Sequence, residues 1–283
     1  MLAEGFAWTP ISQRRNAITA NYEPVQPYLL LQLAELLDGA TFLDVGANIG
    51  FYTLLFANHS HIISVLAFEP NAHCAAEIGK NLALNGLTTR VKIHEMALSD
   101  TQGTAILSLT SKFGGDSGLA DTHLFKQFVK FEQRVRVSRL DDIVQCNGNP
   151  LLIKIDVEGH EYHTLKGAVS TLRENFGFLQ LEILEQNPDK EAIVNLLRSI
   201  GWDQLLSTGA DYYFTNIDKF KSENERLAIL EKTLEKIVEE SLHGIKPSRK
   251  TLIQGVTIEL SRRKVESIKR LWRFSNFNLF KEK

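Results

Sequence analysis

The chain has 283 residues, 43% of them hydrophobic, which is enough for the core of one α/β domain and leaves residues for an appendage. Its 32 basic and 34 acidic residues give a formal net charge of -2, which excludes a general attraction to polyanions, so we expect no nucleic-acid partner. Cys74 and Cys146 lack CxxC spacing, which favours free thiols in a reducing compartment. The first residues lack a secretory signal pattern, and no run approaches the about 20 apolar residues of a spanning helix. We therefore expect a soluble, cytoplasmic protein.

Most of the chain alternates strand-like and helix-like segments. Residues 1–40 are expected to form a helical lead-in, in which a helix over 27–37 is terminated by Gly39. Residues 41–216 alternate short β-branched runs with amphipathic stretches, which predicts a Rossmann-like α/β fold with a mostly parallel sheet and helices on both faces. The predicted strands are 41–45, 63–69, 91–96, 151–156 and 178–183, and the predicted helices are 71–85, 161–174 and 190–199.

The segment 103–140 interrupts this alternation. TAILSL and RVRVSRL are expected to form an antiparallel pair that flanks the glycine-rich segment 114–118. A long loop at this position is either functional or mobile. We predict a substrate-facing loop there, and a plain hairpin loop is the alternative.

A glycine-bounded turn follows the first predicted strand. This glycine loop, Gly46-Ala47-Asn48-Ile49-Gly50, comes directly after Asp44-Val45 and opens a helix. Glycine at both ends lets the backbone turn sharply and approach a ligand closely. The dinucleotide fingerprint GxGxxG is not matched, because only Gly46 and Gly50 are present. Asp44 instead suits a ligand with cationic groups, such as an ammonium beside a sulfonium. The alternative is a purely structural turn.

Two later positions suit the other parts of an adenosine ligand. Glu69 lies at the end of the next strand, at the roughly 20-residue spacing of an acid that accepts hydrogen bonds from ribose hydroxyls. Ala97 and Leu98 follow the third strand and offer a small apolar shelf for an adenine ring. The alternative for Glu69 is a solvated surface charge, and the alternative for Ala97 and Leu98 is ordinary packing.

Acidic residues gather where the fourth and fifth strands end. Strand alternation places Asp156 and Glu158 on one side of the chain, and Glu182 lies on the next strand. An aliphatic hydroxyl needs a base that removes its proton, and Asp156, Glu158 and His160 are the catalytic candidates. We favour a carboxylate, because crowding and burial raise its proton affinity. Binding of a divalent metal by these residues and Glu182 is a less favoured alternative, and His160 also suits a helix terminus.

Residues 217–283 are predicted to form a C-terminal helical appendage. One helix is expected over 222–242 and a second, rich in Lys and Arg, over 248–272. Apolar residues of the first helix recur three and four apart, at Leu227, Leu230, Leu234 and Ile237. Aromatic residues interleave with the basic ones near the end of the second helix. This pattern fits peripheral contact with an anionic membrane or a partner protein, or, as we prefer, a face that packs on the domain or on a second subunit in a homodimer.

Taken together, five stretches resemble the FkbM family of methyltransferases. They are FLDVGANIGFYTLLFA, LAFEPNAHCAAEIGKNLALNGL, HEMALSD, RLDDIV and IKIDVEGHEYHTLKGA, within about residues 42–168, with a looser match at 21–24. The resemblance implies the class I methyltransferase fold, with S-adenosylmethionine as the methyl donor. It also implies O-methylation of a hydroxyl on a sugar, a glycan or a natural product.

The resemblance also implies residue roles. The donor-binding residues would be Asp44, Gly46 and Asn48 near the methionine end, Ala47 and Gly50 of the same loop, Glu69 for the ribose, Ala97 for the adenine, and Asp156. Asp156 and Glu158 would face the reacting groups.

Three other functions share parts of this pattern. A nicotinamide-dependent oxidoreductase would need the missing middle glycine. An amino-methyltransferase would carry an Asn/Asp-Pro-Pro-aromatic tetrad where this chain has Asp156-Val157-Glu158-Gly159. An inactive methyltransferase-like scaffold is disfavoured by the intact acids and glycines, and it would fail to bind the donor.

Overall fold

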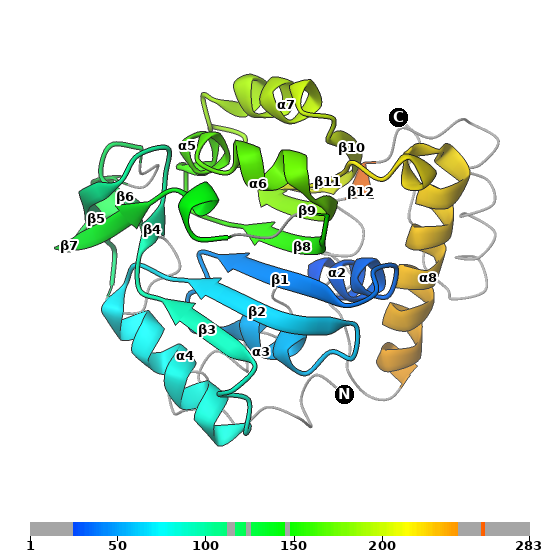
Figure 1. Cartoon of the computed structure of the whole chain (residues 1–283), viewed down its shortest axis with the longest axis horizontal. Coiled ribbons are helices and arrows are strands. Elements are labelled where there is room, and N and C mark those ends of the chain that lie inside the picture. Colours follow the sequence, from blue (N-terminus) through cyan, green and yellow to red (C-terminus); the bar gives the residue numbers. More distant parts are fainter. Residues whose placement is uncertain (1–24, 112–116, 123–125, 145–147, 243–255, 258–283) are drawn as a thin grey trace.

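The structure is a computed structural model that describes residues 25–111, 117–122, 126–144, 148–242 and 256–257. In this part of the chain, eight strands form a large sheet in the order β12-β10-β11-β9-β8-β1-β2-β3 (Figure 1). Their bounds are β1 (Ala40–Val45), β2 (Ile62–Phe68), β3 (Val91–His94), β8 (Pro150–Ile155), β9 (Phe176–Glu182), β10 (Asp203–Thr208), β11 (Asp211–Thr215) and β12 (Val256–Thr257). The strands from β9 to β3 run parallel, whereas β11 is antiparallel to β9.

Helices bury both faces of the large sheet. The helices are α2 (Gln26–Ala34), α3 (Phe51–Ala57), α4 (Ala72–Leu84), α5 (Glu161–Lys166), α6 (Val169–Glu174), α7 (Lys190–Ser199) and α8 (Glu223–Leu242). Phe42 and Leu152 pack in one core with α2, α3 and α8, whereas the next residues, Leu43 and Ile153, pack in another core with α5, α6 and α7. Alternate side chains of a strand point to opposite faces, so these strands are apolar throughout. The predicted fold class is confirmed.

A second, four-stranded sheet has the order β4-β7-β5-β6. Its strands are β4 (Ala97–Leu98), β5 (Gly103–Leu109), β6 (Gly118–Leu119) and β7 (Phe131–Ser138), and β5 pairs antiparallel with β7 as predicted. Of the predicted substrate-facing loop, residues 114–116 lie outside the described residues. Short 3-10 turns are η1 (Lys126–Phe128), η2 (Leu140–Asp142) and η3 (Asp218–Lys221).

Several predicted boundaries were wrong. The helix expected over 161–174 is divided into α5 and α6, because the carboxylate of Asp141 accepts the backbone N–H of Thr171 at 2.8 Å and so gives α6 its own start. The helix expected over 27–37 ends at Ala34, well before Gly39, and the third strand ends at His94. The hairpin of β10 and β11 was not predicted.

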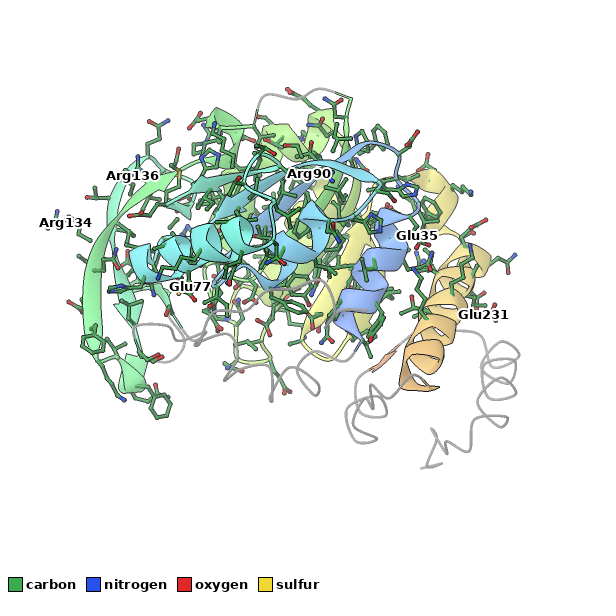
Figure 2. The ribbon with its side chains drawn as sticks, turned by 90° about the horizontal axis from the view of Figure 1, so that it is seen from below. Glu35, Glu77, Arg90, Arg134, Arg136 and Glu231 are labelled. Atoms are coloured by element: carbon green, nitrogen blue, oxygen red, sulfur yellow. The ribbon has the colours of Figure 1, made fainter. Side chains whose placement is uncertain are left out.

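The first helix of the predicted appendage is α8, which lies beside α2 (Figure 2). Its Leu227 and Leu230 are buried, and its Lys236 forms an ion pair with Glu35 after α2. The predicted helix over 248–272 is wrong at 256–257, which form β12 against β10. The rest of that helix, residues 1–24 and Cys146 lie outside the described residues. Within the described ranges, no helix is long and apolar enough to cross a membrane.

Candidate active site

The carboxyl ends of β1, β8 and β9 lie side by side. The parallel register pairs Val45 with Ile155, and it pairs Ile155 with Leu181. One residue further along each strand, Asp156 and Glu182 therefore stand at the same level of the sheet. Ligands of open α/β sheets bind outside such carboxyl ends. The register thus gathers the predicted acids at the edge where a ligand is expected.

The glycine loop is held against the chain that leaves β8. Gly46 has φ +83°, and a Cβ on it would lie 1.8 Å from the carbonyl oxygen of Asp156. Gly50 has φ +89°, and a Cβ on it would lie 3.2 Å from the side chain of Ile78 on α4. The close approach that requires Gly46 is therefore made by the protein's own backbone, whereas the sequence pattern had suggested a ligand in that place.

Gly46→Ala is expected to lower the free energy of unfolding by about 3 kcal/mol or more, because it combines a left-handed backbone with a clash against a fixed carbonyl. Gly209→Ala is the matched control, since Gly209 has φ +62° and a Cβ on it would meet nothing within 4 Å. That variant should cost about 1 kcal/mol. Urea denaturation of both variants checks this, and equal losses would contradict the contact with Asp156.

The carboxylate of Glu69 is fixed by two backbone donors. The N–H of Asn48, within the glycine loop, donates to Oε2 at 2.7 Å, and the N–H of Asn71 donates to Oε1 at 2.8 Å. Asn48 has φ +52°, a left-handed conformation that asparagine tolerates better than most residues. Burial raises the pKa of Glu69 to about 8, despite these two hydrogen bonds. Each carboxylate oxygen accepts more than one hydrogen bond, so Glu69 retains acceptor capacity for a ligand.

The other residues predicted to contact the methyl donor are also buried. Asp44 is 1% exposed, its carboxylate accepts the hydroxyl hydrogen bond of Thr53, and burial raises its pKa. Ala97 packs in the small core of the second sheet, and Leu98 packs in the main core. Leu98 is therefore committed to packing, and the adenine shelf at Ala97 stays a prediction.

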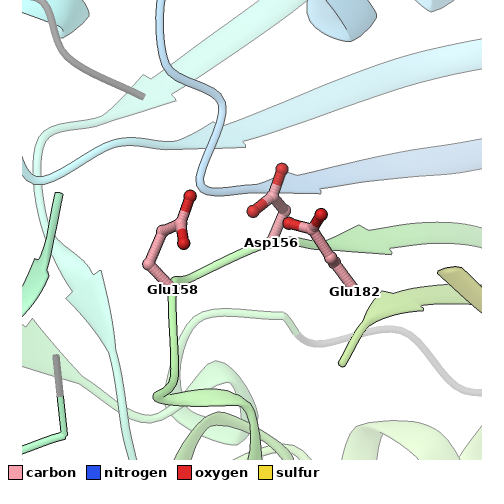
Figure 3. A group of neighbouring side chains, drawn as sticks. All are labelled: Asp156, Glu158 and Glu182. Atoms are coloured by element: carbon pink, nitrogen blue, oxygen red, sulfur yellow. The ribbon is translucent and has the colours of Figure 1, made fainter. Parts of the chain in front are cut away.

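Three carboxyl groups converge after β8 and β9. Asp156, Glu158 and Glu182 each offer an oxygen atom, and these atoms all lie within 4.8 Å of one another (Figure 3). The Nζ of Lys154 is 2.8 Å from Oδ2 of Asp156. Asp156 and Glu182 also share a side-chain hydrogen bond. The sequence prediction that these acids meet is matched by their positions, although Asp156 and Glu158 lie beyond the strand end, and Glu158 has φ +55°.

The two hydrogen-bonded acids have opposite pKa shifts. Burial tends to raise the pKa of Asp156, but the charge of Lys154 and the hydrogen bonds from Glu182 and Lys154 lower it overall. The negative charge of Asp156, together with burial, raises the pKa of Glu182 to about 10. Asp156 is thus the ionised member at neutral pH, and Glu182 holds the proton. The sequence predicted a raised proton affinity for the catalytic carboxylate. The raised pKa instead belongs to Glu182, the neighbour of Asp156.

A fourth acid, missed in the sequence, supports the turn that carries Glu158. Glu161 is 2% exposed, and its carboxylate accepts the N–H of Gly159 at 2.9 Å and the side-chain amide of Asn187 at 2.7 Å. Burial raises its pKa to about 7. The run Glu158-Gly159 before a helix was the available signal, because a residue near a helix start often bonds backbone amides of the preceding turn.

His160 is held by hydroxyl groups. Its Nδ1 lies 2.8 Å from Thr122 Oγ1, its Nε2 lies 2.9 Å from Ser99 Oγ, and its ring stacks on His163. Among the described residues, His160 does not belong to the cluster of three carboxyl groups whose oxygen atoms lie within 4.8 Å of one another. Burial, followed by the charge of His163, lowers its pKa to about 4. The histidine is therefore neutral at pH 7, and both of its ring nitrogens are engaged.

This shift predicts a pH-dependent stability. Because the folded pKa is about 4 and the ordinary value is 6.5, the unfolded chain binds the proton more readily, so His160 favours folding above pH 6.5 and this contribution is lost as the pH falls toward 4. His160→Gln keeps one donor and one acceptor but does not titrate. Its unfolding free energy should fall less between pH 7 and pH 4.5 than that of the wild type, by on the order of 2 kcal/mol. His73→Gln, on the exposed side of α4, is the control. Parallel pH profiles for all three proteins would contradict the assignment.

Comparison with known proteins decides the family. The family model of the methyltransferase FkbM domain matches residues 44–220, which include the glycine loop, Glu69 and the carboxyl cluster. The chain belongs to the FkbM methyltransferase family. It is thereby an S-adenosylmethionine-dependent methyltransferase domain with the Rossmann-like class I fold, as the sequence resemblance implied.

Two of the curated relatives of this FkbM domain are named as methyltransferases. Methyltransferase sdnD of Sordaria araneosa is 28% identical over 198 residues, which is 60% of this chain and 76% of that protein. Methyltransferase 1 of Beauveria bassiana is 25% identical over 182 residues, which is 58% of this chain and 73% of that protein. The tRNA wybutosine-synthesizing protein 2 homolog of Rattus norvegicus is 36% identical over 76 residues, only 25% of this chain and 17% of that protein.

Among solved structures, methyltransferase FkbM from Methylobacillus flagellatus aligns with a TM-score of 0.47 and 18% identity. The alignment covers 63% of this chain and 44% of that one, so the chain spans less than half the length of that protein.

Proposed function

We propose that this FkbM domain transfers the methyl group of S-adenosylmethionine to a hydroxyl group, with Asp156 as the general base. The observation that carries the proposal is the position of Asp156. Its carboxylate lies 2.8 Å from the ammonium of Lys154 and within 4.8 Å of the carboxyl groups of Glu158 and Glu182, at the carboxyl edge of the sheet, and its pKa is lowered overall. An alcohol attacks poorly while it keeps its proton, so a placed carboxylate is what this acceptor requires.

Glu69 and the glycine loop fit the donor. The remaining acceptor capacity of Glu69 suits the vicinal hydroxyls of a ribose, and its two backbone donors hold it in place for them. The loop from Gly46 to Gly50 lies between Glu69 and Asp156 in space, because it contacts both. The donor supplies an electrophilic methyl group on a sulfonium. Asp44, Ala47 and Ala97 are the other donor contacts that we propose.

In the proposed reaction, Asp156 takes up the proton that the acceptor hydroxyl loses. The acceptor oxygen forms the new O–C bond as the C–S bond breaks, and the sulfur keeps the electron pair of that bond. The hydroxyl proton passes to Asp156. Glu182 already holds a proton and so cannot take this one, and Glu158, on the turn beside them, is placed to orient the acceptor hydroxyl.

A divalent metal at these three carboxyl groups would compete with the partners that Asp156 already has. The ammonium of Lys154 already lies 2.8 Å from Asp156, and the carboxyl group of Glu182 donates a hydrogen bond to the same carboxylate, so a cation would have to displace both. We therefore route no step through a metal. Methyl transfer should persist in excess EDTA, and loss of activity with recovery on adding Mg²⁺ or Mn²⁺ would restore the metal alternative.

The deciding experiment has two parts. Calorimetric titration of the whole chain with S-adenosylmethionine and with NAD should show binding of the first ligand alone. Transfer of a labelled methyl group should then be screened over hydroxylated glycans and natural products, each paired with its deoxy analogue, with tRNA as a comparison. Label on the hydroxyl compound and not on its deoxy analogue is expected. NAD binding, or label on tRNA or on amines only, would overturn O-methylation, and the absence of any donor binding would favour an inactive scaffold.

A further inference from the structure

Lys154 is a charged residue in the middle of a buried strand. It is 4% exposed, and within the described ranges it is the only lysine or arginine among the buried residues. Its Nζ lies 2.8 Å from Oδ2 of Asp156 and 4.9 Å from the centre of the Tyr52 ring on α3. Burial of an ammonium group in this position costs several kcal/mol unless nearby negative charges compensate, because burial removes its hydration water. A buried charge of this kind is a functional candidate.

Lys154 lies at the centre of a group of acids. The register pairs it with Asp44 on β1 and with Gln180 on β9, one pleat before Asp156. Its positive charge acts on Asp44, Asp156, Glu182 and Asp211 alike.

Asp156 receives a direct contact from Lys154, whereas the other acids have partners of their own. Asp44 is bonded by Thr53, and Asp211 is bonded by the amides of Gln26 at 2.8 Å and Gln180 at 2.6 Å. Glu182 is hydrogen-bonded to Asp156 and holds a proton. Lys154 and Asp156 therefore form a fixed ion pair within the site, and the ring of Tyr52 covers another side of the ammonium.

We propose that Lys154 is a positioning residue that balances the charge of Asp156 and so keeps this carboxylate from forming an ion pair with the sulfonium of the donor. The inference rests on the donor site proposed above. Without Lys154, the sulfonium would be the nearest available counter-charge for Asp156. The donor would then be held more tightly than the uncharged product, S-adenosylhomocysteine.

The test is the ratio of affinities for S-adenosylmethionine and S-adenosylhomocysteine, which differ by the charge on sulfur and need no acceptor. Calorimetry at pH 6.5, 7.5 and 8.5 should show that Lys154→Met raises the preference for the charged donor at least about fivefold, because an uncompensated carboxylate attracts the sulfonium. Asp156→Asn should lower it by a similar factor. The double variant should return to within about twofold of the wild type, and Lys154→Arg should keep the wild-type ratio.

The controls separate folding from charge. Lys80→Met removes a lysine whose side chain is 66% exposed on α4, and it should leave the ratio unchanged. If Lys154→Met does not fold, the return from Asp156→Asn to the double variant still measures the coupling, since that pair of substitutions leaves no unpaired charge. Ratios within twofold of the wild type in Asp156→Asn and in every folded Lys154→Met protein would overturn this inference while leaving the donor site intact. Failure of the wild type to bind either ligand would overturn the proposed function itself.

Discussion

Glu69→Ala should weaken the binding of S-adenosylmethionine at least about 30-fold, or about 2 kcal/mol, because it removes hydrogen bonds to a charged acceptor. The same change leaves the backbone N–H groups of Asn48 and Asn71 without their carboxylate partner, so the glycine loop loses its contact with Glu69. Glu69→Gln keeps one carbonyl oxygen and should fall between the variant and the wild type. Glu95→Ala, an exposed acid beyond β3, is the control and should bind as the wild type does. Calorimetric titration measures all four.

The raised pKa of Glu69 adds a pH dependence to this result. Ribose hydroxyls donate to the ionised carboxylate, whereas the free protein holds a proton on Glu69 up to about pH 8. Binding therefore releases a proton below that pH, and the affinity should rise from pH 6.5 to about pH 8 and then level off. Glu69→Gln should show a flat profile over this range. A wild-type affinity that does not change with pH, or full affinity in Glu69→Ala, would contradict the binding of the ribose by Glu69.

Asp156→Asn should lower the turnover of methyl transfer by about 10²- to 10⁴-fold, the range for loss of a general base. The amide keeps the size of the side chain but cannot accept the hydroxyl proton. Binding of S-adenosylhomocysteine should change little, because the uncharged product does not sense the lost charge. The KM for the acceptor should also change much less than kcat, since the base acts in the chemical step.

Initial rates with the acceptor found by screening measure this effect. Asp218→Asn, in η3 with a side chain 95% exposed, is the matched control and should retain wild-type turnover. Turnover of Asp156→Asn within tenfold of the wild type would exclude Asp156 as the base. Glu158→Gln should then be measured as the next candidate.

The strand positions were predictable because buried parallel strands have nearly continuous apolar runs. The β1 and β8 predictions are each within one residue of the structure at either end, and Glu69 falls directly after β2 as expected. The site could be placed because parallel strands end at one edge of the sheet. The hairpin of β10 and β11 escaped prediction because its strands mix polar and apolar residues around a short glycine turn.

The contacts inside the site depend on tertiary packing and had weaker signals. Gly46 marked a close approach, but the sequence did not indicate that the approaching group is the carbonyl of Asp156. Lys154 was visible as the one basic residue within LLIKID, yet only the register with β1 and β9 shows that it lies among acids. Hydrogen bonding of His160 to Ser99 and Thr122 joins segments far apart in sequence, which a single sequence does not reveal.

The row formed by Asp44, Lys154 and Gln180 also bears on how the strands find their alignment. A shift of β8 by one residue would turn its side chains to the opposite face. Lys154 and Asp156 would then turn together toward the apolar side chains of α5, α6 and α7, away from Asp44 on β1, at a cost of several kcal/mol. Strands made only of Val, Ile and Leu would tolerate such a shift more easily. These buried charges therefore favour the native alignment at the centre of the sheet, and the same charges that we propose for the reaction disfavour misregistered states during folding.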